Sequence, residues 1–231
     1  MTITYIGHSG FLTELKHTAL LFDYWEGELP DPPPGKRLYV LVSHRHADHF
    51  NPDIFRLFQP GRDVVFLLSD DIDARRFPDG VSGCTARLAP CSEWTDGRIR
   101  VQTLRSTDEG VAFLVECEGK TLYHAGDLND WQWPGEDPGW NRRMAEAFRR
   151  NIEPLRGQAV DAAFIPLDPR QDAEYAAGLD FFLSLVHARR IFPMHCWEDY
   201  SVIDRWLDEH PSSPYRERIV RITRRGESFA L

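Results

Sequence analysis

The stretch VLVSHRHADHFNPDIF, residues 40–55, carries three histidines and an aspartate within the six positions 44–49. It begins inside the apolar run LYVLVS, which is typical of a short buried strand. It ends with Asn51 as a predicted N-cap and Pro52 at the first position of a predicted helix. The polar cluster therefore lies where a buried strand gives way to a helix.

The spacing inside this cluster predicts a metal site. His44 and His46 are two residues apart, so their side chains point the same way on an extended segment. Asp48 and His49 follow where the chain turns toward the helix and direct a second pair of donors at nearby space. Imidazole and carboxylate groups suit zinc, iron or manganese, and four of them here can serve two adjacent ions. An unliganded polar loop is the alternative, and the spacing argues against it.

The remainder of the chain predicts short strands that alternate with helices. Further strands are predicted at residues 3–6, 10–15, 18–24, 63–68, 98–106, 161–167 and 190–195, and a pair joined by a turn at 111–124. The chain closes with RIVRIT, residues 218–223, and ESFAL, residues 227–231. Helices are predicted at residues 140–155, 174–186 and 200–210. The proline-rich segment Leu29–Lys36 predicts a surface loop. With no repeat and no low-complexity linker, one domain over residues 1–231 is expected.

Composition limits the classes of function. Apolar residues make up 42% and charged residues 27%, as in soluble globular proteins. No apolar run approaches the roughly 18 residues of a membrane helix, and MTITYIGHSGF lacks the pattern of a signal peptide. The net charge of −9 argues against nucleic-acid binding. Four cysteines without a CxxC pair predict reduced thiols, and a cytoplasmic location is expected.

Several stretches resemble motifs of the metallo-β-lactamase superfamily. SHRHADH resembles its HxHxDH signature, TLYHAGDLND its Gly-Asp motif, and RIFPMHCW its last histidine motif. ITYIGHSGF resembles the opening of the small lactonase-like and phosphodiesterase-like branches, so the resemblance spans nearly the whole chain. It implies an α/β (α+β) fold, a four-layer αββα sandwich of two central mixed sheets with helices outside. The metals are then expected at one edge between the sheets.

The same resemblance implies a set of metal ligands. They are His44, His46, Asp48, His49, Asp127 and His195, with Asp127 as the carboxylate that bridges two metals. Zinc is expected, as one or two ions, with manganese and iron as alternatives. The family normally carries a further histidine beside His44 and His46, yet residues 50–123 contain none. Ser106, Asp108 or a water molecule is expected in its place, and His8 and His124 are further candidates by composition.

Other residues are expected near the ligands. His8 and His124 are predicted either to hydrogen-bond to metal ligands or to contact substrate. Asp168 and Arg170 follow a predicted strand and are expected either to reach the substrate or to form a structural pair. At the site, the Arg170 guanidinium would suit a carboxylate or phosphate of the substrate. Three tryptophans lie close together in DLNDWQWPGEDPGW, where they either wall a substrate pocket or pack in the core.

These residues predict a metal-dependent hydrolase. A bound metal lowers the pKa of a water molecule and delivers hydroxide to a carbonyl or phosphoryl centre, and Asp48 is expected to orient that water. The substrate is expected to be a small ester, lactone or phosphoester. The alternative is a metal-binding protein of the same fold without hydrolytic activity. The sequence leaves the substrate within this class and the oligomeric state open.

Overall fold

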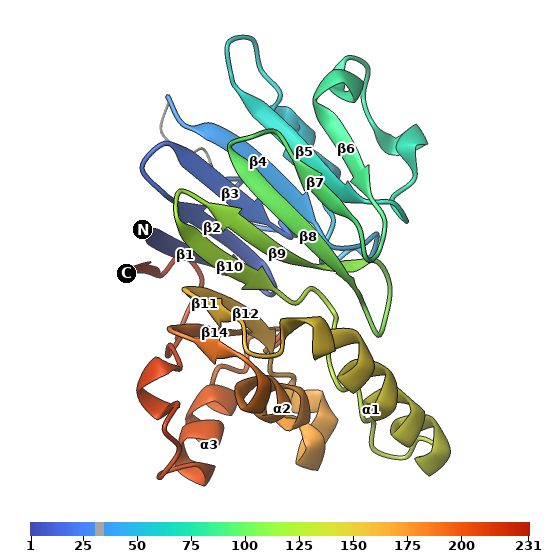
Figure 1. The fold of residues 1–231 in the computed structure, drawn as a ribbon, viewed down its shortest axis with the longest axis vertical. Coiled ribbons are helices and arrows are strands. Elements are labelled where there is room, and N and C mark those ends of the chain that lie inside the picture. Colours follow the sequence, from blue (N-terminus) through green and yellow to red (C-terminus); the bar gives the residue numbers. More distant parts are fainter. Residues whose placement is uncertain (31–34) are drawn as a thin grey trace.

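Two β-sheets face each other in the computed structural model, which describes residues 1–30 and 35–231 (Figure 1). The predicted loop at Leu29–Lys36 falls partly on residues 31–34, outside the described residues. The first sheet has the strand order β15-β1-β2-β3-β4-β5-β6. Its strands are β1 Thr2–Gly7, β2 Gly10–Glu14, β3 Thr18–Phe22, β4 Arg37–Val42, β5 Val64–Ser69, β6 Thr85–Leu88 and β15 Ser228–Ala230.

The second sheet has the strand order β14-β12-β10-β9-β8-β7. Its strands are β7 Glu93–Thr95, β8 Ile99–Arg105, β9 Val111–Cys117, β10 Lys120–His124, β12 Ala162–Pro166 and β14 Ile191–Met194. Two short strands, β11 Ala159–Val160 and β13 His187–Ala188, form a separate parallel pair. Both large sheets mix parallel and antiparallel neighbours.

Aromatic and branched side chains fill the space between the sheets. Phe11 and Phe22 of the first sheet lie 4.5 and 5.6 Å, centroid to centroid, from Phe164 of the second. These three rings are fully buried. Burying such rings removes apolar surface from water at roughly 25 cal/mol per Å², which holds the two sheets together.

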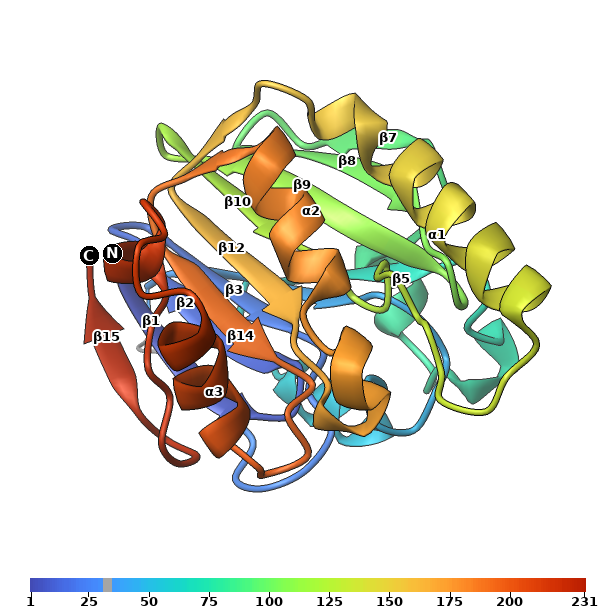
Figure 2. The same cartoon turned by 90° about the horizontal axis from the view of Figure 1, so that it is seen from below.

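The outer faces of the two sheets are covered in different ways. On the second sheet lie the helices α1 Pro138–Ile152, α2 Ala177–Leu185 and α3 Ser201–Glu209 (Figure 2). On the first sheet, Ile54 and Phe55 of the 3₁₀ turn Pro52–Leu57 pack over an apolar cluster. The layered αββα arrangement is confirmed, although the outer layer of the first sheet is built from 3₁₀ turns. Among the described residues, no helix has the length and apolarity needed to cross a membrane.

Most predicted elements are present with small shifts. The predicted N-cap is confirmed, since the Asn51 side chain accepts the Asp53 amide, but the turn that follows is 3₁₀ rather than α-helical. Residues 218–223, the stretch RIVRIT, do not form a strand. Ile219 forms only an isolated bridge with Ile191, after which the chain leaves this edge to pair with β1 as β15.

Candidate metal centre

The predicted ligands gather at one edge of the sandwich because seven strands end there. Pairing makes β1, β3 and β4 of the first sheet run the same way, and β8, β10, β12 and β14 of the second likewise. The loops that follow these strands carry the site. Its residues and the strands they follow are His8 (β1), Asp23 (β3), His44 to His49 (β4), Asp108 (β8), Asp127 (β10), Asp168 (β12) and His195 (β14).

One group of potential ligands consists of His44, His46, Asp108 and Asp127. Their ligand atoms all lie within 4.8 Å of one another. His44 Nε2 is 3.0 Å from His46 Nδ1 and 3.6 Å from Asp127 Oδ2, and His46 Nδ1 is 3.2 Å from Asp108 Oδ2. Of the two side chains expected to replace the family's further histidine, Asp108 is the one in this group. Ser106 is buried, and its hydroxyl accepts the Asp108 amide at 3.1 Å.

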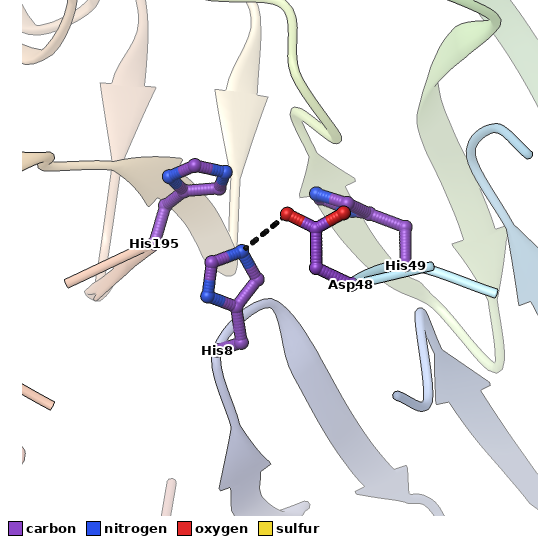
Figure 3. A group of neighbouring side chains, drawn as sticks. All are labelled: His8, Asp48, His49 and His195. Carbon is purple, nitrogen blue, oxygen red and sulfur yellow. Dashed lines mark ion pairs between the residues drawn. The ribbon is translucent and has the colours of Figure 1, made fainter. Parts of the chain in front are cut away.

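A second group consists of His8, Asp48, His49 and His195, again with ligand atoms within 4.8 Å of one another (Figure 3). His8 Nε2 lies 3.4 Å from Asp48 Oδ2. We expected His8 to support ligands or to touch substrate, and the structure instead places it among the potential ligands. Its distance from the histidine cluster in the sequence hid this role, but the turn between two strands in IGHSGF is a usable signal.

Asp127 lies between the two groups. Its Oδ1 is 3.2 Å from His49 Nε2 and 3.5 Å from His195 Nε2, whereas its Oδ2 faces His44. The position is the one that a bridging carboxylate would need. Gly126 allows the close approach of this loop to β4, because a Cβ there would lie 2.7 Å from the Ser43 Cβ.

The donor atoms fit a metal. His8 Nε2, His49 Nε2, His195 Nε2 and Asp127 Oδ1 are buried, and among the described residues none has a hydrogen-bond partner. Buried polar atoms are normally paired, so four such atoms that converge indicate a missing ligand. Burial lowers the pKa of His8 and of His44 to about 4, which leaves both imidazoles neutral at pH 7 and able to bind a cation. Neutral imidazole and carboxylate are the ligands that zinc, manganese and iron accept.

Buried carboxylates hold two of these histidines by their other ring nitrogen. Asp23 lies 2.8 Å from His49 Nδ1 and also accepts the Ser43 amide and hydroxyl. Although burial opposes ionisation, the nearby His124 and His49 lower the pKa of Asp23. A carboxylate on Nδ1 fixes the tautomer that presents Nε2 to a metal. The sequence analysis missed Asp23, an acidic residue directly after an apolar strand that ends at this edge.

Asp168 holds His195 in the same way, at 2.9 Å from Nδ1. It also accepts two bonds from the Arg170 side chain and lies 3.3 Å from Trp197 Nε1. Asp168 is fully buried, so it supports a potential ligand and does not contact substrate. Arg170 is half exposed, and its guanidinium forms an ion pair with the buried Asp168.

His124 lies outside the space where substrate can reach. It is fully buried and stacks on Phe22 at 4.9 Å. Both ring nitrogens are bonded, Nε2 to the Ser9 carbonyl and Nδ1 to the Gly126 amide. The expectation that His124 contacts substrate is therefore wrong. Its bond to Gly126 instead shapes the loop that carries Asp127.

A cavity of about 390 Å³ opens beside the two groups. Asp48, Asp108, Asp127 and His195 face it on one side. Its other walls are Trp131, Trp133, Trp140, Met144, Arg170 and Trp197. The three clustered tryptophans thus line a cavity, although Trp131 is also almost completely buried.

Comparison with known proteins agrees with this geometry. Residues 2–132 match the family described as the Beta-lactamase superfamily domain. A UPF0173 metal-dependent hydrolase of Opitutus terrae is 32% identical over 215 residues, which cover 84% of each chain. Another from Heliobacterium modesticaldum is 26% identical over 225 residues, covering 88% of this chain and 85% of the relative.

Solved structures show the same fold. A metallo hydrolase from Ignicoccus hospitalis superposes with a TM-score of 0.64 at 18% identity, covering 100% of this chain and 98% of the other. A possible metal-dependent hydrolase from Veillonella parvula gives 0.63 at 11% identity, covering 100% and 99%. The fold, the family match and the relative from Opitutus terrae together show that this chain belongs to the metal-dependent hydrolases of the metallo-β-lactamase superfamily.

Proposed function

We propose that the chain holds two metal ions, with zinc as the expected metal, and hydrolyses a small ester, lactone or phosphoester. Among the described residues, the buried Nε2 atoms of His8, His49 and His195 have no hydrogen-bond partner and lie close together. The Nε2 atoms of His49 and His195 also face Asp127 Oδ1, and this arrangement supports the proposal most strongly. Manganese and iron are the alternatives, because the donor set contains both imidazoles and carboxylates.

The two groups would hold the ions in different surroundings. His44, His46 and Asp108 form the first site, and His8, Asp48, His49 and His195 the second. Asp127 is shared, since its two oxygens face different groups. Metal ions bound here would polarise the substrate carbonyl or phosphoryl group and make water acidic enough to attack near neutral pH.

The side chains around the metals have separate tasks. Asp48 is part exposed and faces the cavity, where its carboxylate orients the attacking water. Asp23 and Asp168 keep His49 and His195 in the tautomer with Nε2 turned inward. The tryptophan walls exclude bulk water from the reacting group, which strengthens the electrostatic interactions inside.

Elemental analysis of protein purified without added metal, followed by a hydrolysis panel, tests this proposal. The panel contains a simple ester, a lactone and a phosphoester. We expect about two metal ions per chain and turnover of at least one panel member. Asp127→Ala should lose metal and activity together, whereas Asp161→Asn, a surface change next to Lys120, should keep both. Metal without turnover across the panel would favour the metal-binding protein without hydrolysis.

A further inference from the structure

We infer that the cavity beside the metal groups receives a planar aromatic group of the substrate that carries no negative charge. This inference rests on the proposed function in one respect, namely that the aromatic group belongs to the molecule that is hydrolysed. It is carried by the walls of the cavity, by their charges and by the size of the space.

Three separate parts of the chain bring indole rings to this cavity. Trp131 and Trp133 follow Asp127, Trp140 lies in the first turn of α1, and Trp197 follows His195. Trp131 and Trp133 are parallel, 5.6 Å apart between centroids. Indole faces favour flat aromatic partners over saturated groups of similar size by about 0.5–1.5 kcal/mol. Such a set of walls favours an aromatic ligand.

The charges of the cavity disfavour an anionic ring. Among the described residues that line the cavity, Arg170 is the one lysine or arginine. Its guanidinium lies 4.3 Å from the Trp197 centroid and binds the buried Asp168 at 2.6 and 3.0 Å. Because Asp168 already matches this charge, an anionic ring gains no free cation among these walls.

The position of the rings connects the aromatic site to the chemistry. The Trp131 ring lies 5.2 Å from the His195 ring, so a ligand among the tryptophans is adjacent to the second metal group. The cavity of about 390 Å³ is near the low end of small-molecule sites, which run from roughly 300 to 1,000 Å³. It therefore suits a single ring with a short reacting group.

A matched pair of uncleaved amides tests the aromatic preference. Dissociation constants of benzamide and cyclohexanecarboxamide are measured by calorimetry on the metal-loaded protein. Both probes carry the same amide, so contacts of this amide with metal cancel in the ratio of the two dissociation constants. Benzamide should bind about three- to tenfold tighter. A ratio near one would overturn the inference.

Variants locate the preference. Trp140→Leu should bring the ratio close to one, and Trp140→Phe should keep most of it. Trp94→Leu is the matched control. Trp94 lies on β7, outside the cavity, and packs edge-on against Tyr39. If Trp140→Leu fails to fold, Met144→Phe provides a second test, since a further aromatic wall should raise the ratio. An unchanged ratio in folded Trp140→Leu or in Met144→Phe would contradict the inference.

The charge of the ring is tested with 4-carboxybenzamide, which adds a carboxylate at the far end of the ring. It should bind more weakly than benzamide. Tighter binding that is lost in Arg170→Met would instead make this an anion site and overturn the inference. The hydrolysis panel is a separate readout. Turnover with an affinity ratio near one would defeat only the inference, and a high ratio without turnover would defeat only the proposed function.

Discussion

At the residue scale, Asp108 distinguishes this site from the family pattern. It lies in the group to which the family normally contributes a further histidine, so the first site has two imidazoles and two carboxylates. The second site has three imidazoles, from His8, His49 and His195. Carboxylate oxygens suit manganese and magnesium better than imidazole does, and imidazole suits zinc. The two sites should therefore differ in their affinity for zinc.

Replacing Asp108 tests this difference. Asp108→Ala should lower the metal content by about one ion, because the first site then keeps only His44, His46 and the shared Asp127. Asp108→His should raise zinc affinity at this site. Ser106→Ala is the control and should keep both ions, since the Ser106 hydroxyl bonds only within the loop. Elemental analysis measures the metal content of each variant. If Ser106→Ala lost as much metal as Asp108→Ala, the assignment of Asp108 as a ligand would be contradicted.

Asp23 is the second residue with a specific consequence. Asp23→Asn keeps the size of the side chain but removes the carboxylate that holds His49 Nδ1 at 2.8 Å. Loss of such a supporting carboxylate typically costs about 10–100-fold in metal affinity. We expect this loss at the second site, measured by competition with a chelator of known affinity. Asp161→Asn, remote from the site, should leave the affinity unchanged, and an unchanged value in Asp23→Asn would contradict the role.

At the element scale, a glycine lets the loop after β8 pass against the end of β4. Gly110 has φ +66°, and a Cβ there would lie 2.0 Å from the Ser43 carbonyl oxygen and 2.6 Å from the His44 Cβ. Gly119 in the β9–β10 turn has φ +73° but open space around it. The same substitution therefore meets backbone strain at both positions and a steric clash at only one.

The pair Gly110→Ala and Gly119→Ala separates these two costs. Gly119→Ala should lower the free energy of unfolding by about 1–2 kcal/mol, the cost of a left-handed conformation. Gly110→Ala should lower it by more and should also reduce metal content, because relief of the clash displaces His44. Chemical denaturation and elemental analysis give both values. Equal effects of the two variants would show that the close approach is unimportant.

The elements that the sequence predicts well are those with a continuous apolar pattern. The apolar run LYVLVS, residues 38–43, predicts β4, because a buried parallel strand needs apolar residues on both faces. Strands β6 and β7 were missed because they are short, lie at sheet edges and contain a single buried residue, Leu88, between them. Residues 218–223 have a strand-like pattern, yet only tertiary pairing could decide that the chain leaves that edge.

The same limit applies to the site. Local spacing was enough to predict the cluster His44 to His49, and a motif resemblance added Asp127 and His195. The roles of His8 and Asp23 depend on strand ends that are distant in sequence, and so does the presence of Asp108 rather than Ser106 in the first group. Local sequence patterns do not indicate which strand ends become neighbours in the fold.

At the scale of the whole molecule, the metal groups join the two sheets. His8 and the residues 44–49 come from the first sheet, and Asp108, Asp127 and His195 come from the second. The ligands of each ion are therefore assembled only when the sheets are packed together. A metal that binds this assembled state stabilises the fold by mass action.

The free energy of unfolding should thus depend on free metal. Above the dissociation constant, each tenfold rise in free metal should add about 1.4 kcal/mol per site, and removal by a chelator should reverse the gain. Asp127→Ala removes the carboxylate that faces both groups, so this variant should lose most of the dependence. Asp161→Asn alters the pairing of Asp161 with Lys120 and the Thr121 amide, away from the metal groups, and should keep the wild-type slope. Denaturation at a series of buffered metal concentrations measures the slopes. A slope of zero in the wild type would mean that the metal does not link the sheets, and an unchanged slope in Asp127→Ala would place the link on other residues.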